Sequence, residues 1–259
     1  MELKDKIAVV TGGGSGIGEG LCRRFMEEGA KAVVVVDIVT EDAERVAADL
    51  GQIAKTVDVA KEDEIKALIE DVEANVGPID LFVSNAGIGL SDPSHVASAS
   101  NEGWQRIWEI NVMAHVYAAR HMLPLMLDRG HGYLLNTASA AGLLSQIGSA
   151  AYSVTKAGAV AFAETLSIAH KDQGIGVSVL CPQAVRSKMT AGHEDGVASG
   201  DGLLEPAQLA ETTIQCLREE KFLVLPHPEV ETYIQRKAGD YDRWLDGMRR
   251  WRDKYLAKR

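Results

Sequence analysis

The sequence predicts an α/β fold, a doubly wound parallel sheet of about seven strands flanked by helices. Short β-branched runs alternate along the chain with segments of helical length, and most of these runs are continuously apolar, as in strands buried on both faces. Such alternation is typical of strand–helix–strand units, whose crossovers are right-handed. No internal repeat or linker divides the 259 residues, so we expect a single domain spanning 1–259.

The expected strands lie at 7–10, 32–36, 81–83, 133–135, 177–180 and 222–225, with a weaker candidate at 56–59. Helix-length segments lie between them, at 17–28, 41–50, 62–76, 101–128, 151–172 and 206–219. Two segments depart from this pattern. Residues 184–205 are rich in glycine, serine and charge, which favours a lid over the substrate site. Residues 228–259 are expected to form a C-terminal helical extension.

Composition excludes several classes of function. The net charge of −10 argues against a nucleic-acid partner, because a phosphate-binding surface needs an excess of cations. No run approaches 18 apolar residues and no signal peptide precedes the first strand, so we expect no membrane span and a cytoplasmic location. The three cysteines and seven histidines show no metal-ligand spacing, so no metal site is expected.

A glycine-rich turn, T-G-G-G-S-G-I-G at 11–18, follows the first strand and opens the first helix. Glycines there let the backbone approach a pyrophosphate, whose charge is stabilised by the helix N-terminus. Alone this signal is weak, but Asp37 ends the second strand 19 residues after Gly18, where a carboxylate can accept both ribose hydroxyls. Asp37 would repel the 2′-phosphate of NADP, and neither Ser15 nor Ile38 supplies a cation. The turn therefore predicts a site for NAD.

Tyr152 and Lys156 are neighbours on one helix face at i and i+4, and Ser139 ends a strand 13 residues earlier. Reduction of a carbonyl needs a proton donor beside the developing alkoxide. A cation about 4–6 Å away is expected to lower the Tyr152 pKa toward neutrality, while the serine holds the substrate oxygen. Tyr233 and Lys237 have the same spacing but no such serine upstream, so we interpret them as a solvated helix face.

With these motifs the chain resembles the shorter, one-domain branch of the short-chain dehydrogenase/reductase family over about residues 4–226. The resemblance implies a Rossmann fold and a homo-oligomer, either a tetramer or a dimer. It also implies the following cofactor contacts: Gly12, Ser15, Gly16, Ile17, Gly18, Asp37, Ile38, Asp58, Val59, Asn85, Ala86, Gly87, Tyr152, Lys156, Pro182 and Val185.

The same resemblance implies a catalytic tetrad of Asn111, Ser139, Tyr152 and Lys156. Tyr152 would be the general acid and base, and Ser139 would orient the substrate oxygen. Lys156 would bind the nicotinamide ribose and lower the Tyr152 pKa, while Asn111 would hold a water in a proton relay. The chain departs from the family where Gln183 follows Pro182 in place of the usual glycine, so Gln183 is expected to contact substrate together with Ser139 and Tyr152.

The segments expected to border the substrate pocket are mainly apolar, at 140–144, 146–148 and 184–185, with Leu90, Val96 and Met189. No cation lies in the inner segments to pair with a buried carboxylate or phosphate. We therefore expect an NAD-dependent dehydrogenase of a secondary alcohol with a hydrophobic cyclic or aryl, steroid-like skeleton. The alternatives are a reductase of small polar ketones, sugars or acyl-carrier ketones, and a dinucleotide-binding sensor without turnover.

Overall fold

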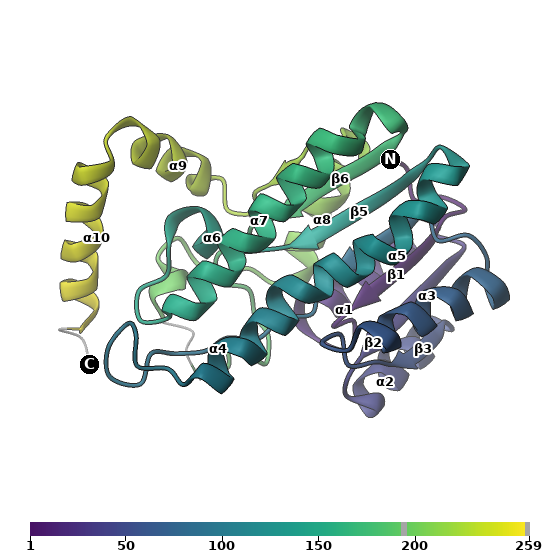
Figure 1. Cartoon of the computed structure of the whole chain (residues 1–259), viewed down its shortest axis with the longest axis horizontal. Coiled ribbons are helices and arrows are strands. Elements are labelled where there is room, and N and C mark those ends of the chain that lie inside the picture. Colours follow the sequence, from purple (N-terminus) through teal and green to yellow (C-terminus); the bar gives the residue numbers. More distant parts are fainter. Residues whose placement is uncertain (193–195, 257–259) are drawn as a thin grey trace.

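One parallel sheet of seven strands, in the order β3-β2-β1-β4-β5-β6-β7, forms the centre of the computed structural model (Figure 1). The model describes residues 1–192 and 196–256. The strands are β1 (Ile7–Thr11), β2 (Ala32–Asp37), β3 (Ile53–Thr56), β4 (Leu81–Ser84), β5 (Gly132–Thr137), β6 (Ile175–Leu180) and β7 (Leu223–Val224). The doubly wound fold predicted from the sequence is confirmed.

Helices cover both faces of this sheet. One face packs against α1 (Gly16–Glu27), α2 (Thr40–Leu50) and α8 (Pro206–Arg218), and the other against α3 (Glu62–Asn75), α5 (Ala114–Arg129) and α7 (Ala150–His170). Along β1, Ala8 and Val10 pack on the side of α1, α2 and α8, while Ile7 and Val9 pack on the side of α3, α5 and α7. Because the central strands β1, β2 and β4 bury both of their faces, their sequences are almost continuously apolar rather than alternating.

The weaker strand prediction, 56–59, is wrong by three residues. The edge strand β3 ends at Thr56, and its pairing with β2 runs from Val34 opposite Ile53 to Asp37 opposite Thr56. The chain then turns at Asp58, whose Oδ1 accepts from the Ala60 amide at 3.1 Å. Val57 and Val59 are buried from this turn, so their apolar character reflects burial outside a strand.

The single helix predicted over 101–128 is divided into three parts. α4 (Asn101–Trp108) leads into a π-helical turn, η1 (Glu109–Met113), and then into α5. A π-turn contains an extra residue, which turns side chains away from their α-helical directions and is frequent at functional sites. Here it holds Asn111, one of the predicted catalytic residues. A short helix that the sequence analysis did not predict, α6 (Ala140–Leu144), follows Ser139.

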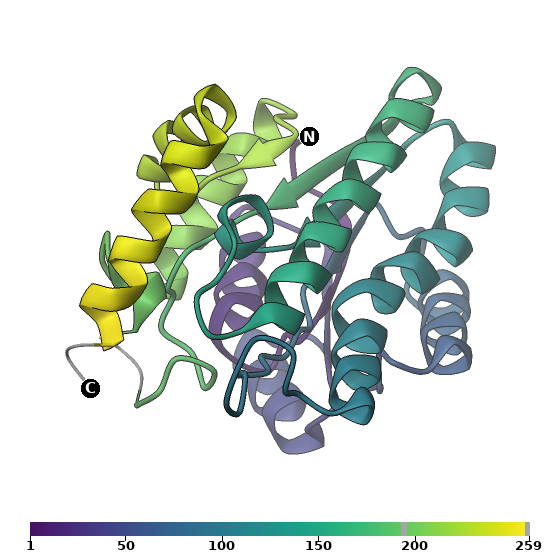
Figure 2. The ribbon, with the colours of Figure 1, turned by 60° about the vertical axis from the view of Figure 1, so that its left-hand side comes forward.

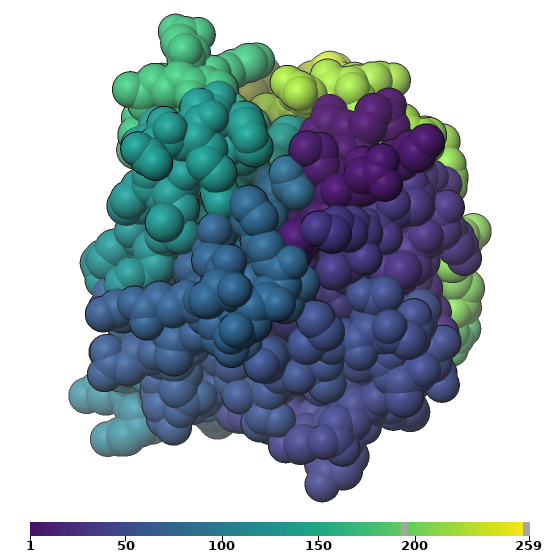
Figure 3. Space-filling view, turned by 90° about the vertical axis from the view of Figure 1, so that its right-hand side faces the viewer, coloured from purple at the N-terminus to yellow at the C-terminus, as the bar shows by residue number. Residues whose placement is uncertain are grey.

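The predicted C-terminal extension is helical, as α9 (Glu229–Gly239) and α10 (Tyr241–Leu256). Both helices lie at one end of the molecule, beyond α6 (Figures 1 and 2). The opposite end is formed by the N-terminal half of the chain, coloured purple and blue in Figure 3. Val230 of α9 is fully buried against Ala140 and Leu144, so the extension packs onto the segment that follows β5.

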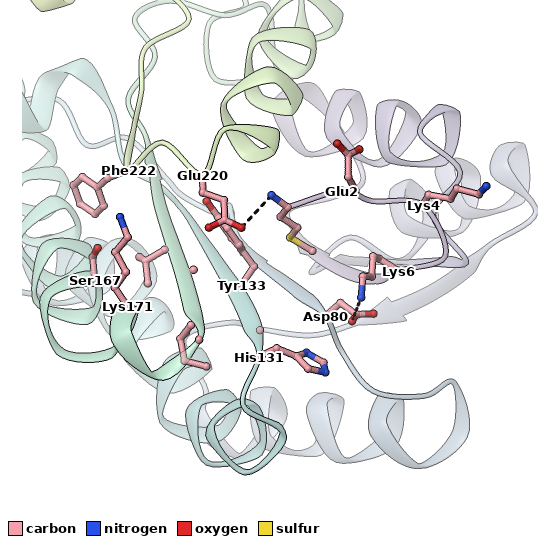
Figure 4. Close-up of a pocket in the computed structure, with 16 residues that line it drawn as sticks. Glu2, Lys4, Lys6, Asp80, His131, Tyr133, Ser167, Lys171, Glu220 and Phe222 are labelled. Carbon is pink, nitrogen blue, oxygen red and sulfur yellow. Dashed lines mark hydrogen bonds and ion pairs between the residues drawn. The ribbon is translucent and has the colours of Figure 1, made fainter.

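No helix in the described ranges is long and apolar enough to cross a membrane. A cavity of about 500 Å³ lies at the amino ends of β1, β4, β5 and β6 (Figure 4). Two ion pairs lie within it, between Lys6 and Asp80 at 3.0 Å and between the Met1 amino group and Glu220 at 3.3 Å. Ligands of open α/β sheets bind at the carboxyl ends of the strands, so the functional site is expected at the opposite edge of the sheet.

Candidate active site

A cleft of about 710 Å³ lies at the carboxyl ends of the strands. It brings together nearly all of the residues that the sequence analysis singled out: Gly12, Ser15, Gly16, Ile17, Asp37, Ile38, Asp58, Val59, Asn85, Ala86, Gly87, Ser139, Tyr152, Lys156, Pro182, Gln183 and Val185. Two predicted residues, Gly18 and Asn111, do not line the cleft but lie directly behind it. Segments more than 170 residues apart in sequence therefore meet at one surface.

The glycine-rich turn depends on the absence of side chains at two positions. Gly12 has a φ of +64°, and a Cβ there would lie 3.0 Å from the Cα of Ala86. At Gly18 a Cβ would lie 2.0 Å from the carbonyl oxygen of Gly12, so this glycine lets α1 pack against the turn. Ser15, the N-cap of α1, makes no side-chain capping bond, which leaves first-turn N–H groups available to an anion.

The carboxylate of Asp37 is fixed by the backbone at the end of β2. Its Oδ2 accepts from the Gly14 amide at 3.0 Å, and its Oδ1 accepts from the Val39 amide at 3.1 Å. Each carboxylate oxygen has a further lone pair, so both can still accept from hydroxyl groups. The side chain is thus held in one orientation with acceptor capacity left on both oxygens.

Two cations close to this region already have acidic partners. Arg45 donates to the Gly14 carbonyl at 2.8 Å and pairs with Glu19 at 2.8 Å. Lys188, from the lid, pairs with Asp42. Asp42 in turn lies beside Gly14, because a Cβ added to Gly14 would be 2.7 Å from the Cβ of Asp42. Both cations are thereby neutralised beside the Asp37 carboxylate.

Thr11 connects the glycine turn to the segment after β4. Its hydroxyl accepts from the amides of Asn85 at 2.9 Å and Ala86 at 3.1 Å, and its carbonyl accepts from Asn85 Nδ2 at 2.9 Å. Further along the cleft, Arg106 of α4 lies 3.5 Å from Asp58. The sequence analysis missed Arg106, because nothing in the pattern of α4 distinguishes this cation from an ordinary exposed one.

Tyr152 and Lys156 project from α7 into the cleft, with the Lys156 Nζ 5.7 Å from the centre of the Tyr152 ring. The ammonium donates to the Thr137 carbonyl at 2.9 Å. A Cβ on Gly87 would lie 3.2 Å from Nζ, so this glycine leaves room for the ammonium. Lys156 is 3% exposed and forms no ion pair among the described residues, and its burial lowers its pKa to about 8.

The predicted lowering of the Tyr152 pKa is wrong for this structure. Burial raises the pKa of Tyr152, and the neighbouring Ser139 hydroxyl offsets only part of that rise. The physical reason is that burial disfavours the charged form of both groups, the phenolate as well as the ammonium. The phenol therefore keeps its proton at neutral pH, which suits a proton donor.

Ser139 joins the ends of β5 and β6. Its Oγ donates to the Pro182 carbonyl at 3.3 Å and accepts from the Ala141 amide at 3.1 Å, which caps α6. Asn111, fully buried in the π-turn, accepts from the Ile88 amide at 2.9 Å and donates to the Ile88 carbonyl at 3.0 Å. Asn111 thus holds the segment after β4 in place from behind the cleft.

The first turn of α7 is held from a distant part of the chain. The Ala150 amide donates to the Asp92 carboxylate at 3.0 Å, and Ser149 Oγ donates to the Leu90 carbonyl at 2.5 Å. A carboxylate at a helix N-terminus is stabilised by the helix dipole. Asp92 therefore helps to place Tyr152, and the sequence analysis missed it because its partner lies 58 residues away.

Comparison with known proteins agrees with this geometry. The model of the family described as short chain dehydrogenase matches residues 6–197. The chain belongs to the short-chain dehydrogenase/reductase family. An uncharacterized oxidoreductase of Staphylococcus aureus is 33% identical over 222 residues, 85% of this chain and 94% of the relative. The meso-2,3-butanediol dehydrogenase of Serratia marcescens is 32% identical over 195 residues, covering 74% of this chain and 76% of that enzyme.

Two solved structures are similar over most of the chain. A short chain dehydrogenase/reductase from Burkholderia phymatum in complex with NAD superposes with a TM-score of 0.86 at 25% identity, covering 93% of this chain and 96% of the other. A 3-ketoacyl-(acyl-carrier-protein) reductase from Brucella melitensis complexed with NADH gives a TM-score of 0.80 at 31% identity, covering 86% and 96%. The chain is therefore an oxidoreductase of this family.

The substrate side of this dehydrogenase differs from the prediction. Ala140 and Leu144, expected to form an apolar wall, face the extension and pack against Val230. Val96 is 68% exposed. The predicted apolar residues that line the cleft are Leu90, Ala184, Val185 and Met189, and they are accompanied by the polar side chains of Ser91, Gln146, Ser149 and Gln183. The cleft is consequently of mixed polarity.

The interpretation of Tyr233 and Lys237 as a solvated face is also wrong. Tyr233 donates to Asp201 Oδ1 at 2.9 Å, and its ring lies 6.3 Å from that of Trp244. Lys237 donates to the Leu143 carbonyl at 2.6 Å. Both side chains face α6 and the lid because α9 docks there through Val230, which no local sequence pattern reveals.

The segment predicted to be a lid, 184–205, contributes residues within 184–190 and Ala198 to the lining of the cleft, and 193–195 lie outside the described residues. Its two ends meet where Val185 pairs with Leu204, and the Leu204 amide donates to the Ala184 carbonyl at 3.1 Å. A Cβ on Gly16 would lie 2.8 Å from the Cβ of Ser187. The first part of the lid therefore rests on the glycine turn.

A buried histidine, His115, lies one turn after Asn111. Its Nδ1 is 2.9 Å from Asn136 Oδ1, while its Nε2 has no hydrogen-bond partner. Burial, followed by the charge of Lys156, lowers the pKa of His115 to about 4. The neutral form is therefore the native one. Across residues 1–192 and 196–256, no three His, Cys, Asp or Glu side chains are grouped so as to hold a metal ion.

We predict that His115 makes the fold acid-sensitive. Between pH 6.5 and about 4 the unfolded chain binds a proton at this histidine and the native state does not, so the free energy of unfolding falls as pH falls. The loss reaches about 3 kcal/mol at the acid end. Chemical denaturation at a series of pH values measures it, and His115→Leu should flatten the slope. His131→Leu, at an exposed histidine, should keep the wild-type slope, and equal slopes in wild type and His115→Leu would contradict the assignment.

Proposed function

We propose that this protein is an NAD-dependent oxidoreductase that interconverts a secondary alcohol and its ketone. The observation that carries the proposal is the meeting of Ser139, Tyr152 and Lys156 in one cleft with the glycine turn and Asp37. A nicotinamide dinucleotide, when bound, supplies the acceptor or donor of the hydride. The relatives complexed with NAD and NADH support this choice of cofactor.

The chain's own residues would handle the proton and the orientation of the substrate. Tyr152, protonated at neutral pH because of its burial, would donate its proton to the substrate oxygen during ketone reduction and remove it during alcohol oxidation. Ser139, fixed by its bond to the Pro182 carbonyl, would hold that oxygen beside the phenol. Lys156 would place a positive charge next to the phenolate formed in the reaction.

The described residues fit a dinucleotide without a 2′-phosphate. The first turn of α1 offers uncapped N–H groups to a pyrophosphate. Asp37 offers two oriented carboxylate oxygens to a ribose diol. A phosphate at the 2′ position would face this carboxylate, while Arg45 and Lys188 are already paired with acids.

We predict at least a 100-fold preference for NAD over NADP in kcat/KM. Like charges about 4 Å apart repel by up to about 4 kcal/mol at an effective dielectric constant of about 20, which allows a ratio of this size. The substitution Asp37→Ser should reduce the ratio at least tenfold. Asp71→Asn, which removes a carboxylate on α3 that pairs with Lys55 away from the cleft, should leave it unchanged. Equal kcat/KM for the two cofactors in the wild type would overturn the prediction.

We predict that Tyr152→Phe lowers kcat/KM by about 10³-fold, because the phenol carries the proton in both directions. NADH binding, followed by nicotinamide fluorescence, should change less than threefold. Tyr117→Phe, a matched loss of one hydroxyl on α5, should keep wild-type turnover. If Tyr152→Phe retains turnover, the assignment of the acid is wrong. If the wild type binds NADH but turns over no alcohol or ketone, the protein is a dinucleotide sensor.

For the substrate we propose a hydrophobic cyclic or aryl secondary alcohol. Leu90, Ala184 and Met189 offer an apolar surface to a ring, whose burial contributes roughly 25 cal/mol per Å². No acidic group is expected on the substrate, because the innermost cation, Lys156, lies beside the catalytic tyrosine. Small polar ketones, sugars and acyl-carrier ketones are the competing classes.

A panel of steroid, alicyclic and aryl secondary alcohols with NAD, read by nicotinamide absorbance, tests this substrate class. We predict that the best cyclic or aryl alcohol exceeds glycerol and simple sugar alcohols in kcat/KM by at least tenfold. Met189→Ser should lower kcat/KM for the cyclic substrates more than for the small ones, because it removes apolar contact area. Higher kcat/KM for the small polyols would contradict the proposal.

A further inference from the structure

Gln183 takes part in a hydrogen-bonded bridge between three distant segments. Its Nε2 donates to Asp201 Oδ2 at 2.9 Å, and the second oxygen of the same carboxylate accepts from the Tyr233 hydroxyl at 2.9 Å. Gln183 follows β6, Asp201 belongs to the lid and Tyr233 belongs to α9. The residue that replaces the family's usual glycine is therefore connected to both the predicted lid and the C-terminal extension.

The bridge fixes which end of the Gln183 amide faces the cleft. A carboxylate can only accept hydrogen bonds, so the NH₂ group must face Asp201. The opposite end of the amide is the carbonyl oxygen, Oε1, and none of the described residues donates to it. Because Gln183 lines the cleft, a hydrogen-bond acceptor is available at the substrate side.

The backbone that carries this acceptor lies next to Ser139. Gln183 directly follows Pro182, whose carbonyl accepts from Ser139 Oγ at 3.3 Å. The backbone N–H of Gln183 donates to His227 Nδ1 at 3.2 Å, and this bond anchors the backbone at Gln183. Burial lowers the pKa of His227, so its imidazole remains neutral and keeps accepting this bond. The position of Gln183 is thus fixed relative to the serine that would orient the substrate oxygen.

Tyr233 is itself held rigidly. Its helix docks through Val230, which is fully buried, and through Lys237, which donates to the Leu143 carbonyl at 2.6 Å. Partial burial and the adjacent Asp201 carboxylate raise the pKa of Tyr233, so its hydroxyl keeps the proton that it donates. The extension thereby reaches the Asp201 carboxylate through the Tyr233 hydroxyl.

We propose that Gln183 is a specificity-determining residue whose amide oxygen accepts a hydrogen bond from a second hydroxyl of the substrate, on a carbon next to the one that reacts. Asp201 and Tyr233 are positioning residues that orient the amide. An acceptor at this position favours a substrate with a donor over an analogue that lacks one. The inference rests on the proposed function and makes its substrate more specific, a cyclic or aryl alcohol with a neighbouring hydroxyl.

The test compares three compounds built on the best skeleton of the alcohol panel: the parent alcohol, the diol with a hydroxyl on the neighbouring carbon, and its monomethyl ether, which cannot donate at that position. The wild type should favour the diol over the ether and the parent about tenfold in kcat/KM, the effect of one hydrogen bond. Gln183→Leu and Gln183→Gly should each abolish this preference, so that kcat/KM values for the diol, the ether and the parent lie within about threefold of one another. NADH binding by both variants verifies that they fold.

Tyr233→Phe should raise KM for the diol about threefold without changing kcat for the parent, because the amide loses its fixed orientation rather than its acceptor. A variant with both Gln183→Leu and Tyr233→Phe should behave as Gln183→Leu alone, since both changes act through the contact of the Gln183 amide with the substrate. Gln215→Leu is the matched control, because it breaks an exposed amide–carboxylate bond to Glu211 on α8, remote from the cleft. This control should leave the preference at its wild-type value.

A diol-to-ether ratio that is the same in wild type and Gln183→Leu overturns the role of Gln183, even where turnover itself is normal. A Tyr233→Phe variant identical to the wild type, with Gln183→Leu affected, overturns the positioning role of Tyr233. Absence of wild-type turnover on every skeleton overturns the proposed function and this inference with it.

Discussion

The buried ammonium of Lys156 is the constraint on which the rest of the site depends. A buried charge without a carboxylate partner is costly, and here it is stabilised by the Thr137 carbonyl at 2.9 Å. The position of the ammonium requires Gly87, whose missing side chain leaves room for Nζ. The close packing of α6 on α7 requires Gly142, where a Cβ would lie 2.5 Å from the Lys156 carbonyl oxygen. The chain therefore brings β5, α6 and the segment after β4 close to one residue of α7.

The two halves of the cleft are built in different ways. The cofactor half is preorganised by backbone groups, as the amides of Gly14 and Val39 show in orienting Asp37. The proposed substrate half is lined by side chains of several segments, among them Leu90, Gln183 and Met189, and Gln183 is joined to the extension through Asp201. Backbone contacts depend little on residue identity, whereas side-chain contacts change with single substitutions. Single substitutions are therefore expected to alter the second half more than the first.

Burial, rather than pairing of opposite charges, dominates the ionisation of the site. It raises the pKa of Tyr152 and lowers the pKa values of Lys156 and His115, so all three shifts oppose charge. The neutral Tyr152 phenol can donate a proton, and the Lys156 ammonium beside it is fixed by the Thr137 carbonyl. This arrangement suits the proposed reduction of a ketone at neutral pH. Because burial also keeps His115 neutral, the free energy of unfolding is expected to fall as the pH falls.

The sequence by itself determined the doubly wound sheet, the glycine turn and the positions of Ser139, Tyr152 and Lys156, because each depends on local spacing or on the periodicity of apolar residues. It did not locate the end of β3 at Thr56, because the buried turn that follows is as apolar as a strand. It also did not locate the π-turn or α6. Only the tertiary structure turned the predicted apolar wall at 140–144 toward α9 and joined Tyr233 to Gln183 through Asp201. These contacts join residues from about 20 to 90 positions apart, and such pairings depend on how elements pack rather than on any local pattern.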